Sequence, residues 1–200
     1  MIDKFKDDKF ARAIAEFDGE NAQDPTRDPE SGRPKELVYA EQMTRWLEKL
    51  APTASEALRL AARAQHIKRW EIPRGRYPMD RIGYLKWRTD LKNFHAKLAR
   101  EILSRVGYDD LTVARVQALL RKERLKQDGD AQILEDVICL VFLENYFADF
   151  AKQHDAEKIV DIVRKTWKKM SEKGHEAALE LAMTPDAAAL VKKALSVPTP

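Results

Sequence analysis

Apolar residues at helical spacing are the strongest constraint that this sequence sets on its fold. Over residues 86–106 they recur at intervals of three and four along one face. These residues are Trp87, Leu91, Phe94, Leu98, Ile102 and Val106. A second run, residues 131–151, is apolar nearly all round, which is typical of a buried central helix. No segment alternates convincingly with the period of a β-strand, so the pattern predicts an all-α, single-domain helical bundle.

Capping residues mark where several of these helices begin and end. Ser55 is suited to cap a helix over 55–71, and Gly107 to close the helix over 86–106. Thr184 followed by Pro185 predicts the start of a last helix. The other helices are predicted over residues 3–17, 35–50, 112–123, around 159–170 and in a shorter stretch up to 182. We therefore expect one helical domain over residues 1–182, including a long polar loop at 19–35, followed by a helix and tail over 183–200.

Charge and cysteine content exclude several classes of protein. Lysine and arginine (36) nearly balance aspartate and glutamate (33), so bulk charge gives no reason to expect a nucleic-acid partner. The single cysteine, Cys139, excludes an intrachain disulfide and a cysteine-rich zinc cluster. With no export signal and no apolar run of membrane-spanning length, we expect a cytoplasmic protein without a membrane partner. A homodimer is left open.

Asp136 is predicted to project into the densest apolar arc of the 131–151 helix. An unpaired carboxylate there costs several kcal/mol, so Asp136 must be neutralised, paired or ligated. His66 and His95 are the first candidates to meet it, with Arg63 and Arg69 as alternatives. Two imidazoles and a carboxylate can hold a divalent metal (Mn, Fe, Zn or Mg) or carry out acid–base chemistry without one. The alternative is structural, with each histidine satisfied in the core and Asp136 paired with an arginine.

Arginines and aromatic residues crowd the loop that follows His66. Guanidinium groups bind phosphate and carboxylate in pairs of hydrogen bonds and stack on aromatic rings. The candidate ligand-binding residues are Arg69, Arg74, Arg76, Tyr77 and Arg88. They predict a site for a small anionic or phosphorylated ligand. The alternative is a loop held by arginine–tryptophan stacking and surface salt bridges.

Four stretches resemble a domain-of-unknown-function family, family 4202, whose members are sometimes labelled glutamyl-tRNA synthetase-like. They read PKELVYAEQMTRWL, LAARAQHIKRWEIPR, GYLKWRTDLKNFHA and LEDVICLVFLENYFADFA. The resemblance covers about residues 3–182, and the sequence carries no synthetase signature.

The helix order is also similar, more remotely, to that of the HD-domain phosphohydrolases. This resemblance implies an all-α fold and a metal site in which His66, His95 and Asp136 match metal ligands. Ile67 stands where the family has the aspartate of its His-Asp pair. The histidine of the family's first helix has no counterpart, the nearest candidates being Tyr39 and Glu41.

Two functions follow from these residues. In the first, an HD-like hydrolase acts on a phosphorylated small molecule or nucleotide. His66, His95 and Asp136 would hold the metal that activates water, while Arg69 and Arg74 would stabilise phosphate charge. In the second, the chain is a non-catalytic binding module that uses the arginine loop to bind an anionic ligand or partner.

Overall fold

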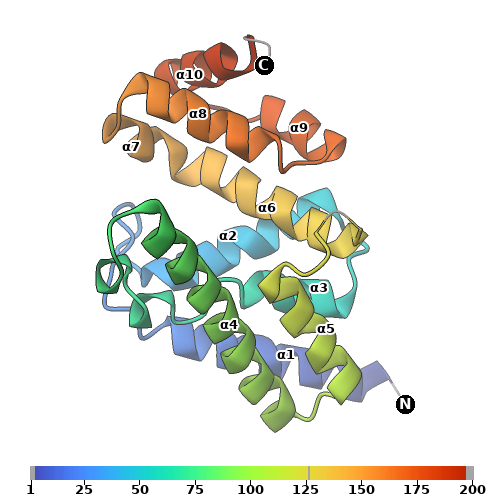
Figure 1. Cartoon of the computed structure of the whole chain (residues 1–200). Helices are drawn as coiled ribbons and strands as arrows, with labels where there is room; N and C mark the ends of the chain where they lie inside the picture. Colours follow the sequence, from blue (N-terminus) through green and yellow to red (C-terminus); the bar gives the residue numbers. More distant parts are fainter. Residues whose placement is uncertain (1–2, 126, 197–200) are drawn as a thin grey trace. The chain divides into compact units, whose positions relative to one another are not determined.

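The computed structural model of the chain describes residues 3–125 and 127–196, and for residues 3–8 the backbone alone (Figure 1). It confirms the all-α fold, since no strand forms in these ranges beyond an isolated bridge between Arg27 and Pro34. The α-helices are α1 Asp3–Asn21, α2 Lys35–Leu50, α3 Glu56–Arg63, α4 Arg81–Val106, α5 Asp110–Arg121, α6 Gly129–Asn145, α7 Phe147–Lys152, α8 Ala156–Trp167, α9 Glu172–Leu179 and α10 Pro185–Ser196. Two short 3₁₀ helices, η1 Arg69–Glu71 and η2 Arg74–Arg76, lie between α3 and α4.

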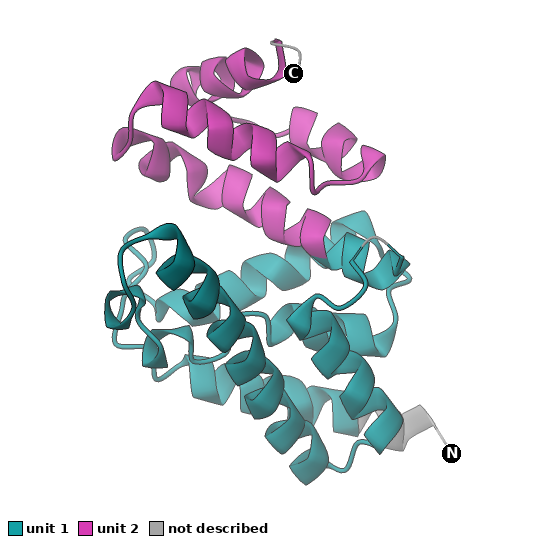
Figure 2. Ribbon diagram, viewed as in Figure 1, with its two compact units in different colours: residues 1–134 teal, residues 135–200 magenta. Residues whose placement is uncertain are grey.

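Contacts divide the chain into two units, residues 1–134 and 135–200, and the division falls within α6 (Figure 2). In the first unit α4 packs on α5 and α1, while α3 packs on α5 and α2. In the second unit α8 packs on α10. Large side chains with almost no exposed area lie in both units, among them Phe17, Met43 and Leu58 in the first and Leu140 and Phe147 in the second.

The structure confirms the helix ends predicted from Ser55, Gly107 and Thr184. The Ser55 hydroxyl accepts a hydrogen bond from the Leu58 amide at the start of α3. Gly107 ends α4 with a φ of 95°, a left-handed conformation that glycine adopts without the steric cost of a Cβ. Thr184 precedes Pro185, the first residue of α10. The tail after residue 196 lies outside the described residues.

The helix predicted over residues 55–71 is wrong in its second half. α3 ends at Arg63, and a series of tight turns carries the chain through residues 64–68. In these turns Ile67 is fully buried, and Lys68 takes a left-handed φ of 49°. The Lys68 amide donates to the side-chain oxygen of Asn21 (3.0 Å) in place of a helix carbonyl. A tertiary hydrogen bond therefore overrides the local helical pattern.

Other helix boundaries also differ from the predicted ranges; α1, for example, continues to Asn21, four residues past its predicted end. α4 begins at Arg81, five residues before the expected start, because the Asp80 carboxylate accepts a hydrogen bond from the Gly83 amide (2.7 Å) and caps the helix there. The apolar run 131–151 is interrupted at Tyr146, between α6 and α7. The Asn145 side chain donates to the Val141 carbonyl just before the break, which competes with the helical hydrogen-bond pattern.

Among the described helices, none combines the length and the apolar character that a membrane crossing requires.

Candidate functional site

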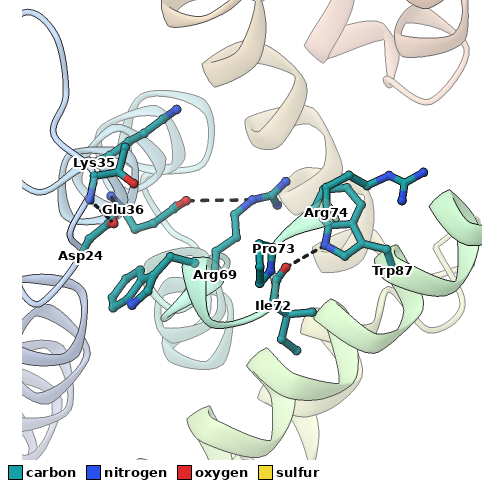
Figure 3. A pocket seen from close by; sticks show the side chains of 10 residues that line it. Asp24, Lys35, Glu36, Arg69, Ile72, Pro73, Arg74 and Trp87 are labelled. Carbon is teal, nitrogen blue, oxygen red and sulfur yellow. Dashed lines mark hydrogen bonds and ion pairs between the residues drawn. The ribbon is translucent and has the colours of Figure 1, made fainter. Parts of the chain in front are cut away.

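Glu36, His66 and Arg69 form a polar cluster within the first unit. The Nε2 atom of His66 lies 3.1 Å from an Nη atom of Arg69, and its Nδ1 atom lies 3.3 Å from a carboxyl oxygen of Glu36. Arg69 Nε lies 4.0 Å from the other Glu36 oxygen, the contact marked in Figure 3. Because a guanidinium group can only donate, His66 Nε2 must accept, and the neutral ring carries its proton on Nδ1.

Buried polar residues from the 19–35 segment hold the backbone on which this cluster is built. Asp24 is 2% exposed and accepts hydrogen bonds from the backbone amides of Thr26 (2.8 Å) and Glu36 (3.0 Å). Asp24 thereby ties the segment to the first turn of α2, where Glu36 lies. Asn21, fully buried, accepts from the Lys68 amide on the other side of His66. The segment is therefore ordered around the cluster and is not a solvated linker over these residues.

Aromatic and imidazole rings enclose His66. The Tyr39 ring stacks on the His66 ring with centroids 4.0 Å apart and an interplanar angle of 12°. The His95 ring, projecting from α4, lies 5.9 Å from the His66 ring and is 3% exposed. His95 Nδ1 has no hydrogen-bond partner among the described residues. The structure thus brings His66 and His95 together, as the sequence predicts.

Burial shifts the pKa values of Glu36, His66 and His95. It raises the pKa of Glu36 to about 7, although Arg69 and Lys35 oppose the shift. Burial also lowers the pKa of His66 well below its usual value, and Arg69 lowers it further. The pKa of His95 is lowered by burial and by His66. At neutral pH the imidazoles are uncharged and Glu36 is near its midpoint, so the contact between His66 and Glu36 is no salt bridge.

A pocket of about 170 Å³ opens beside the cluster (Figure 3). Its charged lining residues are Asp24, Lys35, Glu36, Arg69 and Arg74. Its apolar walls come from Trp70, Ile72, Pro73 and Trp87. The Arg69 guanidinium group lies between the Glu36 carboxyl group and the Trp87 ring, with its carbon 5.0 Å from the ring centroid. The Trp87 indole donates to the Ile72 carbonyl (2.8 Å), which holds this wall in place.

Two of the five predicted ligand-binding residues, Arg69 and Arg74, line the pocket. The other three lie outside its lining. Arg76 donates to the Glu71 carbonyl, the Tyr77 hydroxyl donates to Asp90, and Arg88 donates to the Tyr84 hydroxyl.

Asp136 lies in the second unit and is 1% exposed. One carboxylate oxygen accepts from the Ser171 amide (2.8 Å), and the other accepts from the Ser171 hydroxyl (2.5 Å). The same hydroxyl accepts from the Gly174 amide (3.1 Å) at the start of α9. Asp136 therefore supports the cap of a helix in its own unit. Arg63, considered as its partner, instead forms a paired contact with Asp18 at 2.6 and 2.7 Å.

No group of three or more histidine, cysteine, aspartate or glutamate side chains in residues 3–125 and 127–196 is arranged to hold a metal ion. Metal binding by His66, His95 and Asp136 stays a prediction. The described contacts engage His66 Nε2 with Arg69 and both Asp136 oxygens with Ser171.

Sequence reasoning missed Glu36 and Lys35. A signal for Glu36 was present, because it precedes Tyr39 by three positions and Met43 by seven, on the apolar stripe of α2. We considered Glu41 instead, and that side chain forms a paired contact with Arg33. Nothing in the local pattern distinguishes Lys35 from other lysines.

Comparison with known proteins adds a family and no function. No curated protein and no solved structure matches the chain. A family model does match, over residues 11–191, which is most of the chain. The resemblance to HD-domain phosphohydrolases stays a prediction. The chain belongs to the family described as Domain of unknown function (DUF4202).

Proposed function

We propose that the first unit is a binding module whose pocket takes a small ligand with an oxyanion, either a phosphate or a carboxylate group. The observation that carries the proposal is the position of Arg69. Its guanidinium group lines the pocket, contacts His66 through one Nη atom and faces the Trp87 ring. This arrangement orients a donor-rich planar group beside an aromatic wall, which suits recognition of an oxyanion.

The charges around the pocket support an anionic ligand. Lys35, Arg69 and Arg74 contribute positive charge. Asp24 already accepts two backbone hydrogen bonds, and Glu36 has a pKa of about 7 because it is buried. The three cations outnumber the two carboxyl groups, and below pH 7 Glu36 is mostly protonated, so the lining carries net positive charge.

The size and walls of the pocket support a small ligand with a flat or apolar part. A volume of about 170 Å³ is smaller than that of most drug-sized ligand sites. Trp70 and Trp87 give the pocket aromatic walls against which such a part can pack, and Arg69 and Arg74 lie over the Trp87 ring. Arg74 also donates to the Tyr77 and Pro78 carbonyls, so it shapes the wall in addition to carrying charge.

Phenyl phosphate, which combines the two features, is a direct probe. We expect it to change the tryptophan fluorescence of the protein and to bind more tightly than phenol. Arg69→Gln removes the guanidinium group and should weaken phenyl phosphate binding by about tenfold or more, the usual effect of losing a charged hydrogen-bond pair. Arg69→Lys keeps the charge without the planar fork and should give an intermediate affinity.

Arg45→Gln is the matched control, because Arg45 is an exposed arginine on α2 outside the pocket. It makes the same change in net charge and should leave the affinity unchanged. Circular dichroism of each variant checks that the helices are retained. Equal phenyl phosphate affinities in the Arg69→Gln and Arg45→Gln proteins would contradict the proposal.

A further inference from the structure

Three large apolar side chains stand in solvent where the chain enters α4. Met79 is 81% exposed, Ile82 is 78% exposed and Leu85 is 53% exposed. Ile82 and Leu85 are three residues apart and share a face of α4, and Met79 precedes the helix by two residues. Tyr84, on the same turn of α4, is 41% exposed. We call Met79, Ile82, Tyr84 and Leu85 the 79–85 surface.

Several contacts hold the backbone of this surface in one conformation. Arg74 donates to the carbonyls of Tyr77 (3.0 Å), Pro78 (2.7 Å) and Asp80 (3.3 Å). A Cβ on Gly83 would lie 2.1 Å from the Pro78 carbonyl oxygen, so only glycine allows the turn to approach the helix this closely. The fold therefore builds an ordered turn whose apolar side chains are not buried by the described residues. Such a patch marks an interaction surface more often than a packing defect.

Cations outnumber carboxylates around this surface. Residues 71–90 contain five cations, Arg74, Arg76, Arg81, Lys86 and Arg88, and three carboxylates, Glu71, Asp80 and Asp90. Asp80 caps α4, and Asp90 pairs with Lys86 (3.2 Å). A partner that covers the apolar side chains thus meets an excess of positive charge.

We infer that the 79–85 surface binds the face of an anionic lipid bilayer. Protruding apolar side chains can enter the boundary between headgroups and acyl chains while the surrounding cations meet anionic headgroups. A second copy of the chain would bring the excess positive charge of both surfaces together, which opposes self-association. Met79 and Ile82 are about four-fifths exposed, so a flat protein surface would cover these side chains only in part.

This contact is peripheral. The expectation of no membrane partner rested on the lack of a membrane-spanning run, and the described helices contain no such span. A surface contact needs no span, because a few apolar side chains and a basic cluster act together. The two proposals share Arg74, which lines the pocket and also holds this turn. The variant that tests the pocket is at Arg69, which is not part of the 79–85 surface.

Vesicle sedimentation tests the inference. The full chain is mixed with vesicles of phosphatidylcholine containing roughly 30% phosphatidylserine, and with vesicles of phosphatidylcholine alone. We expect sedimentation with the anionic vesicles only, and weaker binding as salt is raised. Ile82→Gln should lower the affinity for the anionic vesicles by about tenfold, because it removes one large apolar side chain from the contact.

Leu111→Gln is the matched control, since Leu111 is 85% exposed at the start of α5, outside this surface. It should sediment like the unmodified protein. Arg81→Gln should bind more weakly by several-fold, whereas Arg45→Gln should not. Arg69→Gln should keep vesicle binding even where it loses phenyl phosphate, which separates the two proposals.

Three results would overturn the inference. They are no sedimentation of the unmodified protein with anionic vesicles, equal sedimentation with both vesicle types, and equal losses for Ile82→Gln and Leu111→Gln. Far-ultraviolet circular dichroism of the two glutamine variants shows that a loss of binding is not a loss of fold.

Discussion

Replacing Asp136 by alanine is expected to lower the free energy of unfolding by about 3 kcal/mol, which is large for a small domain. The substitution removes the carboxylate that accepts hydrogen bonds from the Ser171 amide and the Ser171 hydroxyl. Both donors then lose this acceptor. The substitution also disturbs the cap of α9, because the Ser171 hydroxyl accepts from the Gly174 amide. Urea denaturation followed by circular dichroism measures the loss.

Asp149→Ala is the control for this prediction. That aspartate is in the same unit, but its side chain is 69% exposed and pairs only with Lys152. Its replacement should change the unfolding free energy by about 0.5 kcal/mol or less. Similar losses for Asp136→Ala and Asp149→Ala would show that the buried contacts with Ser171 are worth little.

Gly174 gives an independent probe of the same contact. A Cβ at this position would lie 2.8 Å from the Asp136 carboxyl carbon, so Gly174→Ala should destabilise the protein by about 1–3 kcal/mol. Gly19→Ala, also in a helix but with open space around the new Cβ, should be neutral or stabilising. The double variant Asp136→Ala, Gly174→Ala should lose less unfolding free energy than the two single variants lose together. The reason is that the methyl group of the alanine at position 174 occupies the space of the removed carboxylate.

A chelator distinguishes this structural role of Asp136 from the predicted metal site. If Asp136 acts through Ser171, the destabilisation by Asp136→Ala is the same with and without EDTA. If it acts as a metal ligand, EDTA destabilises the unmodified protein and removes most of the difference.

The substitution Glu36→Gln is expected to increase the free energy of unfolding, relative to the unmodified protein, by more at pH 8 than at pH 5. Glu36 has a pKa of about 7 in the folded chain and an ordinary value of 4.5 in an unfolded one, so between these values the folded state binds the additional proton. Stability that comes from Glu36 protonation is present below pH 4.5 and is lost as the pH rises through 7. The difference in unfolding free energy between variant and unmodified protein should therefore grow by about 2 kcal/mol from pH 5 to pH 8.

Glu41→Gln on the same helix should show the opposite sign. Its hydrogen bond with Arg33 lowers the pKa of Glu41, so its ionised form stabilises the fold, and the variant should lose stability as the pH rises. A pH-independent effect of Glu36→Gln would mean that Glu36 titrates as an ordinary surface glutamate.

The same protonation bears on the pocket. Above pH 7 the ionised Glu36 should oppose an anion bound near Arg69, so phenyl phosphate affinity should fall with rising pH. In the Glu36→Gln protein that fall should be absent. If phenyl phosphate affinity depends on pH in the same way in the unmodified and Glu36→Gln proteins, the anion does not bind near Glu36.

Much of the helical pattern was predictable because it depends on residues close together in the chain. The apolar spacing of residues 86–106 falls within α4, and Ser55 and Gly107 cap helices as expected. The early start of α4 and the break at Tyr146 involve local contacts of Asp80 and Asn145, whereas the early end of α3 involves a distant residue. Asn21 takes the amide of Lys68, 47 positions away, and the helix predicted to continue to residue 71 ends at Arg63.

The candidate site was predictable in part for the same reason. His66 and Arg69 are three positions apart, and the turns that replace the helix still bring them within 3.1 Å. Glu36, 30 positions before His66 in the chain, places a carboxyl group beside it and was not among the predicted site residues. Asp136 has the predicted burial, but its carboxylate meets Ser171.

By itself, the sequence determined the all-α class, most of the helices and the fact that Asp136 and His95 are buried, because apolar periodicity and caps act within a few residues. Only the tertiary structure decided which partner satisfies each buried polar group. A buried carboxyl group requires a donor or a proton, but local spacing does not specify which distant donor the fold brings to it. For Asp136 that donor is Ser171, whereas Glu36 lies beside His66 and Arg69 with its pKa raised by burial.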